Sequence, residues 1–111
     1  MKENGFFVIL STCPGPEVAE RLARALVEES LAACVNIVPG LRSIYRWNDE
    51  VQSDEEVLMI VKTTAGCLEA ACERLVTLHP YELPEAIALP VADGHHAYLE
   101  WVAASTRTPQ P

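Results

Sequence analysis

The segment His79–Glu85 carries the side chains of this sequence that are best suited to chemistry. It contains a histidine, a tyrosine and two glutamates, and Pro80 and Pro84 bracket the aromatic ring. Because proline lacks a backbone donor and clashes with a preceding helical turn, the segment is a rigid loop and not a helix. Its side chains could bind a small anion, a metal ion or a partner. The alternative is a stiff connector, since turn chemistry accounts for most proline pairs.

The cysteines are a second source of possible chemistry. None of the four forms a C-x-x-C pair, which argues against a zinc ribbon or a thioredoxin-like motif. Cys67 and Cys72 stand five residues apart, so on a helix they point about 140° away from each other. Cys34 and Cys72 fall at apolar positions and are expected to be small core residues. Free thiols are the ordinary state in a cytoplasmic protein.

A histidine pair follows the Asp93-Gly94 turn signal. His95 and His96 with a nearby aspartate could catch a transition metal. We favour the alternative, a solvated polar first turn of a C-terminal helix.

Length and charge limit the function classes. The 111 residues suit one domain, and half of them are hydrophobic, so a core can form. The formal net charge of -8 argues against nucleic acid or an anionic membrane as partner, since both need a basic surface. The sequence has no run of roughly 18 apolar residues and no signal-peptide pattern. We therefore expect a cytoplasmic protein.

Hydrophobic spacing predicts seven elements in the order β-α-β-β-α-β-α. Short apolar runs predict strands, and apolar residues at i, i+4, i+7 and i+8 predict helices. Pro39-Gly40 indicates a bulge in the second strand, and Asn48–Glu50 a turn. The expected strands are 6–12, 31–47, 51–64 and 86–91, and the expected helices are 16–29, 66–78 and a short one around 98–102.

This order gives two split βαβ units, the α+β ferredoxin-like plan, followed by a C-terminal helix. The whole chain, 1–111, is expected to be one domain, with a core of about 6–105 and a flexible tail at 106–111. The predicted hairpin of residues 31–64 is longer than a compact domain of this size needs. Such a hairpin usually pairs with another chain.

Seven segments together resemble one family, the CutA divalent-cation tolerance proteins. They cover nearly all of 6–105, in the right order and spacing. The segments are Leu31–Asn36, Pro39-Gly40, Ser43–Trp47, Val61–Thr64, Leu78–Tyr81, Pro84-Glu85 and Tyr98–Trp101. The resemblance implies a tight PII-like homotrimer of ferredoxin-like subunits, whose long hairpins pair between subunits.

The resemblance also implies copper binding, by a cysteine at the end of the first strand and two histidines before the Pro-Tyr. Here Ser11 stands at the cysteine position and Leu78 at the first histidine, so only His79 matches. Cys13, two residues beyond Ser11, points to the same face if the strand continues. A thiolate and an imidazole suit copper or zinc, and we expect copper or another divalent cation.

The family places a polar cluster in the cleft between subunits. The matching residues here are Trp47, Glu56, Lys62, Tyr81, Glu85 and Trp101. Lys62 lies in an otherwise apolar strand, and an unpaired buried ammonium is costly, so it must reach water, an anion or a carboxylate. Glu56 and Glu85 are the expected counter-charges. Two interpretations of this cluster stay open: a structural ion-pair network that stabilises the trimer, and a ligand site.

We therefore expect a homotrimer that takes part in divalent-cation tolerance by binding and not by catalysis. The sequence has no nucleophile–base pair, no phosphate-binding glycine loop and no metal-hydrolase motif. The alternative function is a PII-like sensor of a small ligand in the cleft around Lys62.

Overall fold

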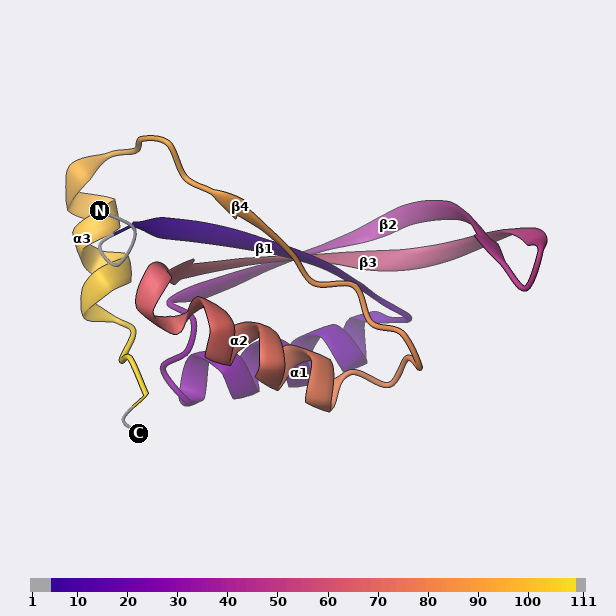
Figure 1. The fold of residues 1–111 in the computed structure, drawn as a ribbon, viewed down its shortest axis with the longest axis horizontal. Coiled ribbons are helices and arrows are strands. Elements are labelled where there is room, and N and C mark those ends of the chain that lie inside the picture. Colours follow the sequence, from indigo (N-terminus) through magenta and orange to yellow (C-terminus); the bar gives the residue numbers. More distant parts are fainter. Residues whose placement is uncertain (1–4, 110–111) are drawn as a thin grey trace.

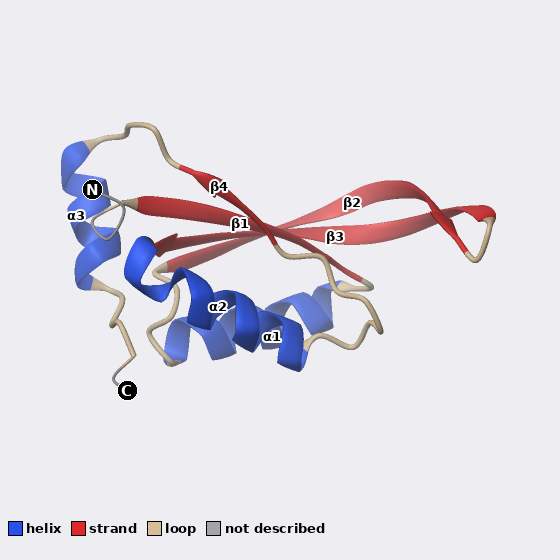
Figure 2. Ribbon diagram, in the orientation of Figure 1, coloured by secondary structure: helices blue, strands red, loops and turns tan. Residues whose placement is uncertain are grey.

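The computed structural model describes residues 5–109. Its secondary structure has the predicted order of four strands and three helices, and Figure 2 shows how they are arranged. The elements are β1 (Phe6–Cys13), α1 (Pro16–Glu28), β2 (Cys34–Trp47), β3 (Glu50–Thr64), α2 (Ala65–Leu78), β4 (Ile87–Pro90) and α3 (His96–Ala104).

The four strands form one antiparallel sheet in the order β2-β3-β1-β4. Helices α1 and α2 lie side by side on one face of this sheet, and α3 stands at one end of it (Figure 1). This arrangement confirms the predicted ferredoxin-like α+β fold. Strand β1 lies between β3 and β4, as its continuous apolar run from Phe6 to Leu10 indicates for a central strand.

Alternation along the central strands decides which side chains meet the helices. Ile9, Ser11 and Cys13 of β1 are fully buried, and the residues between them are less so. In the pairing with β3, Ser11 lies opposite Met59 and Cys13 opposite Val57. Period-two geometry therefore brings a hydroxyl, a thiol and a thioether to the helix-facing side of the sheet.

Each covering helix presents one apolar stripe to the sheet. Proline at the first position starts α1, where its missing donor is not needed. The buried residues of α1 are Ala19, Leu22, Ala23 and Leu26, and those of α2 are Cys67, Ala71 and Leu75. Cys13 and Cys67 are the buried thiols. Cys72 is partly buried and packs against the core, as expected, whereas Cys34 is only partly buried.

The β2–β3 hairpin projects well beyond the helices (Figure 1). Its register shifts between Val38 and Leu41, where Gly40 has a φ of 83°, as the predicted Pro-Gly bulge requires. At the tip Asn48 and Asp49 have φ values of 53° and 65°. Two successive positive φ angles match the twist of a two-residue hairpin turn.

The second strand begins at Cys34 and not at Leu31 as predicted. After α1 the chain turns at Ser30, whose φ is 60°, and the amides of Leu31 and Ala32 both donate to Leu26 O. These bonds belong to the helix end and not to a sheet ladder, which is why the apolar run is not extended here. The last strand is likewise shorter than predicted, and its Pro90 lies on an edge strand.

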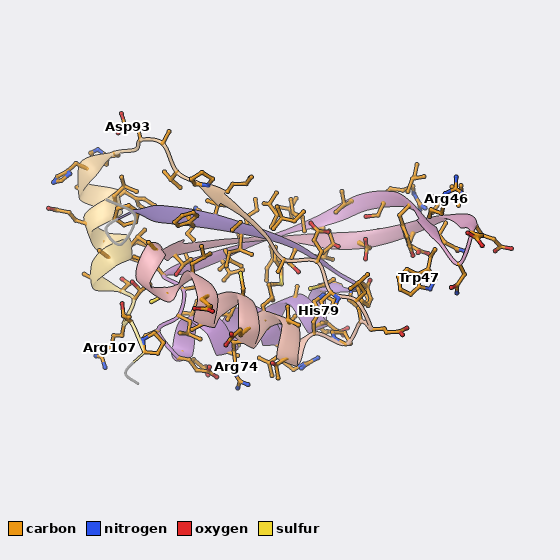
Figure 3. The ribbon with its side chains drawn as sticks, in the orientation of Figure 1. Arg46, Trp47, Arg74, His79, Asp93 and Arg107 are labelled. Atoms are coloured by element: carbon orange, nitrogen blue, oxygen red, sulfur yellow. The ribbon has the colours of Figure 1, made fainter. Side chains whose placement is uncertain are left out.

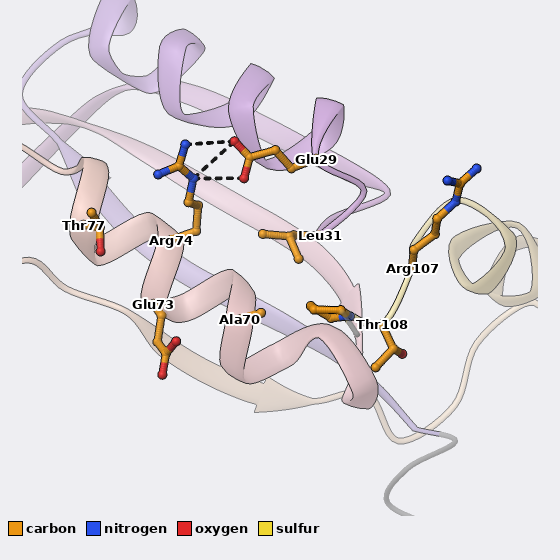
Figure 4. Close-up of a pocket in the computed structure, with 9 residues that line it drawn as sticks. Glu29, Leu31, Ala70, Glu73, Arg74, Thr77, Arg107 and Thr108 are labelled. Atoms are coloured by element: carbon orange, nitrogen blue, oxygen red, sulfur yellow. Dashed lines mark hydrogen bonds and ion pairs between the residues drawn. The ribbon is translucent and has the colours of Figure 1, made fainter. Parts of the chain in front are cut away.

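The C-terminal segment packs back onto the domain after α3. The Arg107 amide donates to Ser30 O at 2.8 Å, and a Cβ on Gly66 would lie only 2.5 Å from Thr108 Oγ1. Nearby, Arg74 of α2 forms a forked ion pair with Glu29 at 2.9 Å (Figure 4). The contacts of Arg107 and Thr108 belong to the first part of the tail predicted at 106–111, whereas residues 110–111 lie outside the described residues.

Candidate functional site

His79 follows the last turn of α2 and turns its ring into the protein, with only 6% of its surface exposed. Figure 3 shows it at the base of the proline loop. Its Nδ1 accepts the Tyr81 amide at 3.1 Å, and its Nε2 lies 2.8 Å from Thr12 O. Because a carbonyl only accepts, Nε2 carries the proton and donates it. The ring is thus neutral and ties the loop to β1.

Cys13 lies beside this histidine. Its Sγ is 3.8 Å from His79 Nε2, and the residue is fully buried. The structure therefore brings together the two side chains that we predict as metal ligands. Burial, and secondarily Glu56, raises the pKa of the Cys13 thiol from 9.0 to about 11, so that it is protonated at neutral pH.

Met59 completes a group of donors that the sequence reasoning missed. Its Sδ lies 3.3 Å from Cys13 Sγ, and the side chain is fully buried. Ser11, its cross-strand partner, has the one buried side-chain oxygen in residues 5–109 that lacks a hydrogen-bond partner. The only signal in the sequence is the alternation of β3, which places residue 59 on the helix-facing side. We call Cys13, Met59 and His79 the soft-donor cluster.

The donor types of this cluster fit copper. Across residues 5–109, no group of three His, Cys, Asp or Glu side chains is arranged to hold a metal ion, so a third ligand must be of another type. Thiolate, thioether and imidazole together suit copper. A metal bound to Nε2 would displace the ring proton to Nδ1. The hydrogen bonds of His79 with Thr12 O and with the Tyr81 amide would then both be lost, each worth about 0.5–1.5 kcal/mol.

Tyr81 separates the soft-donor cluster from the solvent side. Its ring centroid is 4.7 Å from that of His79, and its hydroxyl donates to Glu56 Oε2 at 2.5 Å. Glu56 is only 7% exposed. Burial and this hydrogen bond to a carboxylate raise the pKa of the Tyr81 phenol well above its usual range.

Beyond Tyr81 the hairpin and the proline loop form an open cavity of about 510 Å³, which we call the carboxylate pocket. Thr12 donates to Glu85 across it at 3.1 Å, and Tyr45 donates to Asp54. Four of the six residues predicted for the inter-subunit cleft therefore line one pocket. Its walls are Thr12, Ser43, Tyr45, Arg46, Trp47, Asp54, Glu56, Tyr81, Glu82, Leu83 and Glu85.

The other two cleft residues lie near α3. Lys62 Nζ is 3.4 Å from the Tyr98 hydroxyl and 5.5 Å from the centroid of that ring, and Tyr98 in turn packs against Trp101. Within residues 5–109 of one subunit, Lys62 forms no ion pair with a carboxylate. Counter-charges from Glu56 or Glu85 could thus come only from another subunit, and the six-residue cleft stays a prediction.

The histidines at the start of α3 are exposed. His95 stands at the N-cap position without a side-chain capping hydrogen bond. His96 Nε2 lies 3.0 Å from Glu100 Oε2, with 88% of the His96 side chain exposed. This agrees with a solvated polar first turn.

Comparison with known proteins bears on this arrangement. The family model described as CutA1 divalent ion tolerance protein matches residues 7–105. The chain belongs to this family. A divalent-cation tolerance protein CutA from Thermus thermophilus is 56% identical over 99 residues, which cover 89% of this chain and 96% of the relative. Protein CutA from Homo sapiens is 46% identical over 97 residues, which cover 87% of this chain but only 54% of the human protein.

Solved structures of the family have the same fold. The CutA crystal structure from Xylella fastidiosa has a TM-score of 0.91 at 43% identity and covers 94% of this chain and 100% of its own. CutA1 from Oryza sativa gives 0.92 at 44% identity, over 98% and 100% of the two chains. The relative in Arabidopsis thaliana is named chloroplastic and the Archaeoglobus fulgidus structure periplasmic. The cytoplasmic location therefore stays a prediction for this chain, in whose described part no helix could span a membrane.

Proposed function

We propose that this chain acts in divalent-cation tolerance by binding copper at Cys13 and His79, without turning over a substrate. The observation that carries the proposal is the 3.8 Å approach of Cys13 Sγ to His79 Nε2 in a buried position. A sulfur and an imidazole donor are a combination that copper and zinc accept. Membership of the divalent ion tolerance family supports a role in divalent-cation tolerance, the process in which such a site would act.

The same geometry argues against a thiol-based enzyme. A catalytic cysteine needs a lowered pKa and access to substrate, whereas the Cys13 thiol is fully buried and its pKa is raised. The Nε2 proton of His79 is directed to the Thr12 carbonyl, so this nitrogen is not free to accept the thiol proton. The pair is therefore not arranged as a nucleophile and its general base.

Copper titration of the metal-free protein tests the proposal. Cu(I) and Cu(II) are titrated by calorimetry into the wild type, His79→Ala and Cys13→Ser, with Cys72→Ser as a matched thiol control on α2. Stoichiometric binding that is lost in the first two variants and kept in the control is expected. Circular dichroism of each variant shows whether it is folded. Equal affinity in the folded wild type and Cys13→Ser would overturn the proposal.

We propose that the working form is a homotrimer in which the hairpins pair between subunits. The hairpin extends away from the helices (Figure 1), and large apolar side chains are exposed on it and on the edge strand β4. Ile44 is 72% exposed and Val51 66%, while Ile87 and Leu89 are 52% and 46% exposed. Light scattering should give a mass near three times 12.2 kDa. A monomer would contradict this assembly.

The carboxylate pocket favours a second candidate function, the binding of a small organic cation. Its aromatic rings and its carboxylates, of which Glu56 is almost buried, attract ammonium groups better than anions. Calorimetric titration with 1,4-diaminobutane should show binding that Glu85→Gln weakens. Lys62→Met should leave the affinity unchanged if the pocket belongs to one subunit, because Lys62 does not line it. A loss in Lys62→Met would instead support a cleft between subunits, and no binding at all would exclude this role.

A further inference from the structure

Met59 differs from the other large buried side chains of the sheet because it carries a donor atom. Leucine or isoleucine would fill the same apolar core, as Ile9 does on the neighbouring strand. The thioether sulfur instead touches the Cys13 thiol at 3.3 Å, on the side of the sheet where Cys13 also meets His79. Cys13 of β1 thus has a donor from β3 and a donor from the end of α2 as buried neighbours.

We propose that Met59 is the third copper ligand and that the soft-donor cluster selects Cu(I) over divalent ions. This inference rests on the proposed copper binding by Cys13 and His79. A thiolate and an imidazole around one three-coordinate ion lie about 3.7 Å apart, given bond lengths of roughly 2.3 and 2.0 Å. The 3.8 Å spacing in this structure is close to that value. Two sulfurs bound to the same ion at roughly 2.3 Å each would lie about 4.0 Å apart, so Met59 must move back from its 3.3 Å contact with Cys13 when an ion enters.

Softness of the donors is the first reason for the selection. Thiolate and thioether sulfurs favour Cu(I), whereas divalent ions such as Mg²⁺ and Ca²⁺ favour oxygen ligands. The oxygens beside the cluster are the Thr12 carbonyl, 2.8 Å from His79 Nε2, and the Ser11 hydroxyl, which is buried opposite Met59 without a hydrogen-bond partner. No carboxylate belongs to the cluster itself.

Charge balance is the second reason. A Cu(I) ion and one thiolate have no net charge, whereas a divalent ion with the same ligands leaves one positive charge in a buried site, which is costly. Of the charged neighbours, Glu56 acts on Cys13 more strongly than Arg21 and with the opposite sign. Binding releases the thiol proton to solvent, and no electron is transferred because the ion enters and stays as Cu(I).

The test compares Met59→Leu with Ile9→Leu, which is a similar exchange in the same core but removes no donor. Volume-conserving swaps of this kind usually cost less than about 1.5 kcal/mol, so both variants should fold. Affinity for Cu(I) is measured by competition with a colorimetric chelator. Since even outer-shell partners are worth about 10- to 100-fold in metal affinity, Met59→Leu should lose at least tenfold. Ile9→Leu should match the wild type, and Zn²⁺ affinity should change much less than Cu(I) affinity in Met59→Leu.

A direct readout is the NMR signal of the methionine methyl groups. The chain has two methionines, so the spectrum of Met59→Leu identifies the signal of Met59. Addition of one equivalent of Cu(I) should shift the Met59 methyl resonance. An unshifted Met59 signal in the copper-loaded protein would overturn the inference.

The two proposals fail in different ways. If Cys13→Ser and His79→Ala lose Cu(I) while Met59→Leu keeps the wild-type affinity, copper binding stands and the role of Met59 is wrong. If the wild type and Cys13→Ser bind Cu(I) equally weakly, copper binding itself fails.

Discussion

The soft-donor cluster and the carboxylate pocket lie on the two sides of Tyr81 and offer opposite chemistry. The cluster is buried and presents sulfur and nitrogen, whereas the pocket is open and presents oxygen and aromatic rings. Strand geometry separates them, because Thr12 lines the pocket and the next residue, Cys13, points to the other face. Burial therefore decides which kind of cation each region can hold, although both use the same loop.

The largest effect on stability is expected at the buried region. His79→Ala removes both hydrogen bonds that tie the proline loop to β1 and to Tyr81, and it leaves a cavity and an unpaired carbonyl at Thr12. We expect a loss of about 2–4 kcal/mol in the free energy of unfolding, measured with urea. His96→Ala, at an exposed histidine, is the control and should change little. Equal losses would show that His79 does not anchor the loop.

An intermediate effect is expected at the boundary between the two regions. Tyr81→Phe removes the hydroxyl that donates to Glu56 and leaves that nearly buried carboxylate without this donor. The expected loss in the free energy of unfolding is about 1–3 kcal/mol. Tyr45→Phe removes the matching hydroxyl from exposed Asp54 and should shift the urea midpoint far less. Similar shifts of the urea midpoint in both variants would show that the buried Glu56 and the exposed Asp54 depend equally on their tyrosine donors.

A smaller effect is expected in alkaline solution. The folded-state pKa of Cys13 is raised from 9.0 to about 11, so the unfolded chain gives up this proton first as pH rises. The stability of the wild type relative to Cys13→Ser should be constant below pH 9 and fall between pH 9 and 11. The two proteins are unfolded with urea at pH 7, 9 and 10.5. An equal loss of stability with rising pH in both proteins would mean that the Cys13 thiol is not buried away from water.

Local patterns predict most of the fold, and tertiary contacts account for what they miss. The hydrophobic spacing in β1, α1 and α2 and the Pro39-Gly40 pair are strong local signals. The start of β2 was misplaced because the amides of Leu31 and Ala32 bond to the end of α1, which the apolar run does not reveal. The fold therefore follows from spacing to within about three residues at the element ends.

The candidate site is less visible in the sequence. The meeting of Cys13 with His79 follows from strand alternation together with the family resemblance. Met59 was missed because an apolar strand explains a methionine as well as a ligand site does. The neighbour of Lys62 could not be predicted, since the position of Tyr98 depends on how α3 packs at the end of the sheet.

X-ray absorption at the copper edge of the Cu(I)-loaded wild-type protein tests the central claim most directly. The account predicts a first shell of two sulfurs and one imidazole nitrogen, because Cys13, Met59 and His79 are the proposed ligands. A first shell of oxygen and nitrogen alone would contradict it and would move the ion out to the carboxylate pocket.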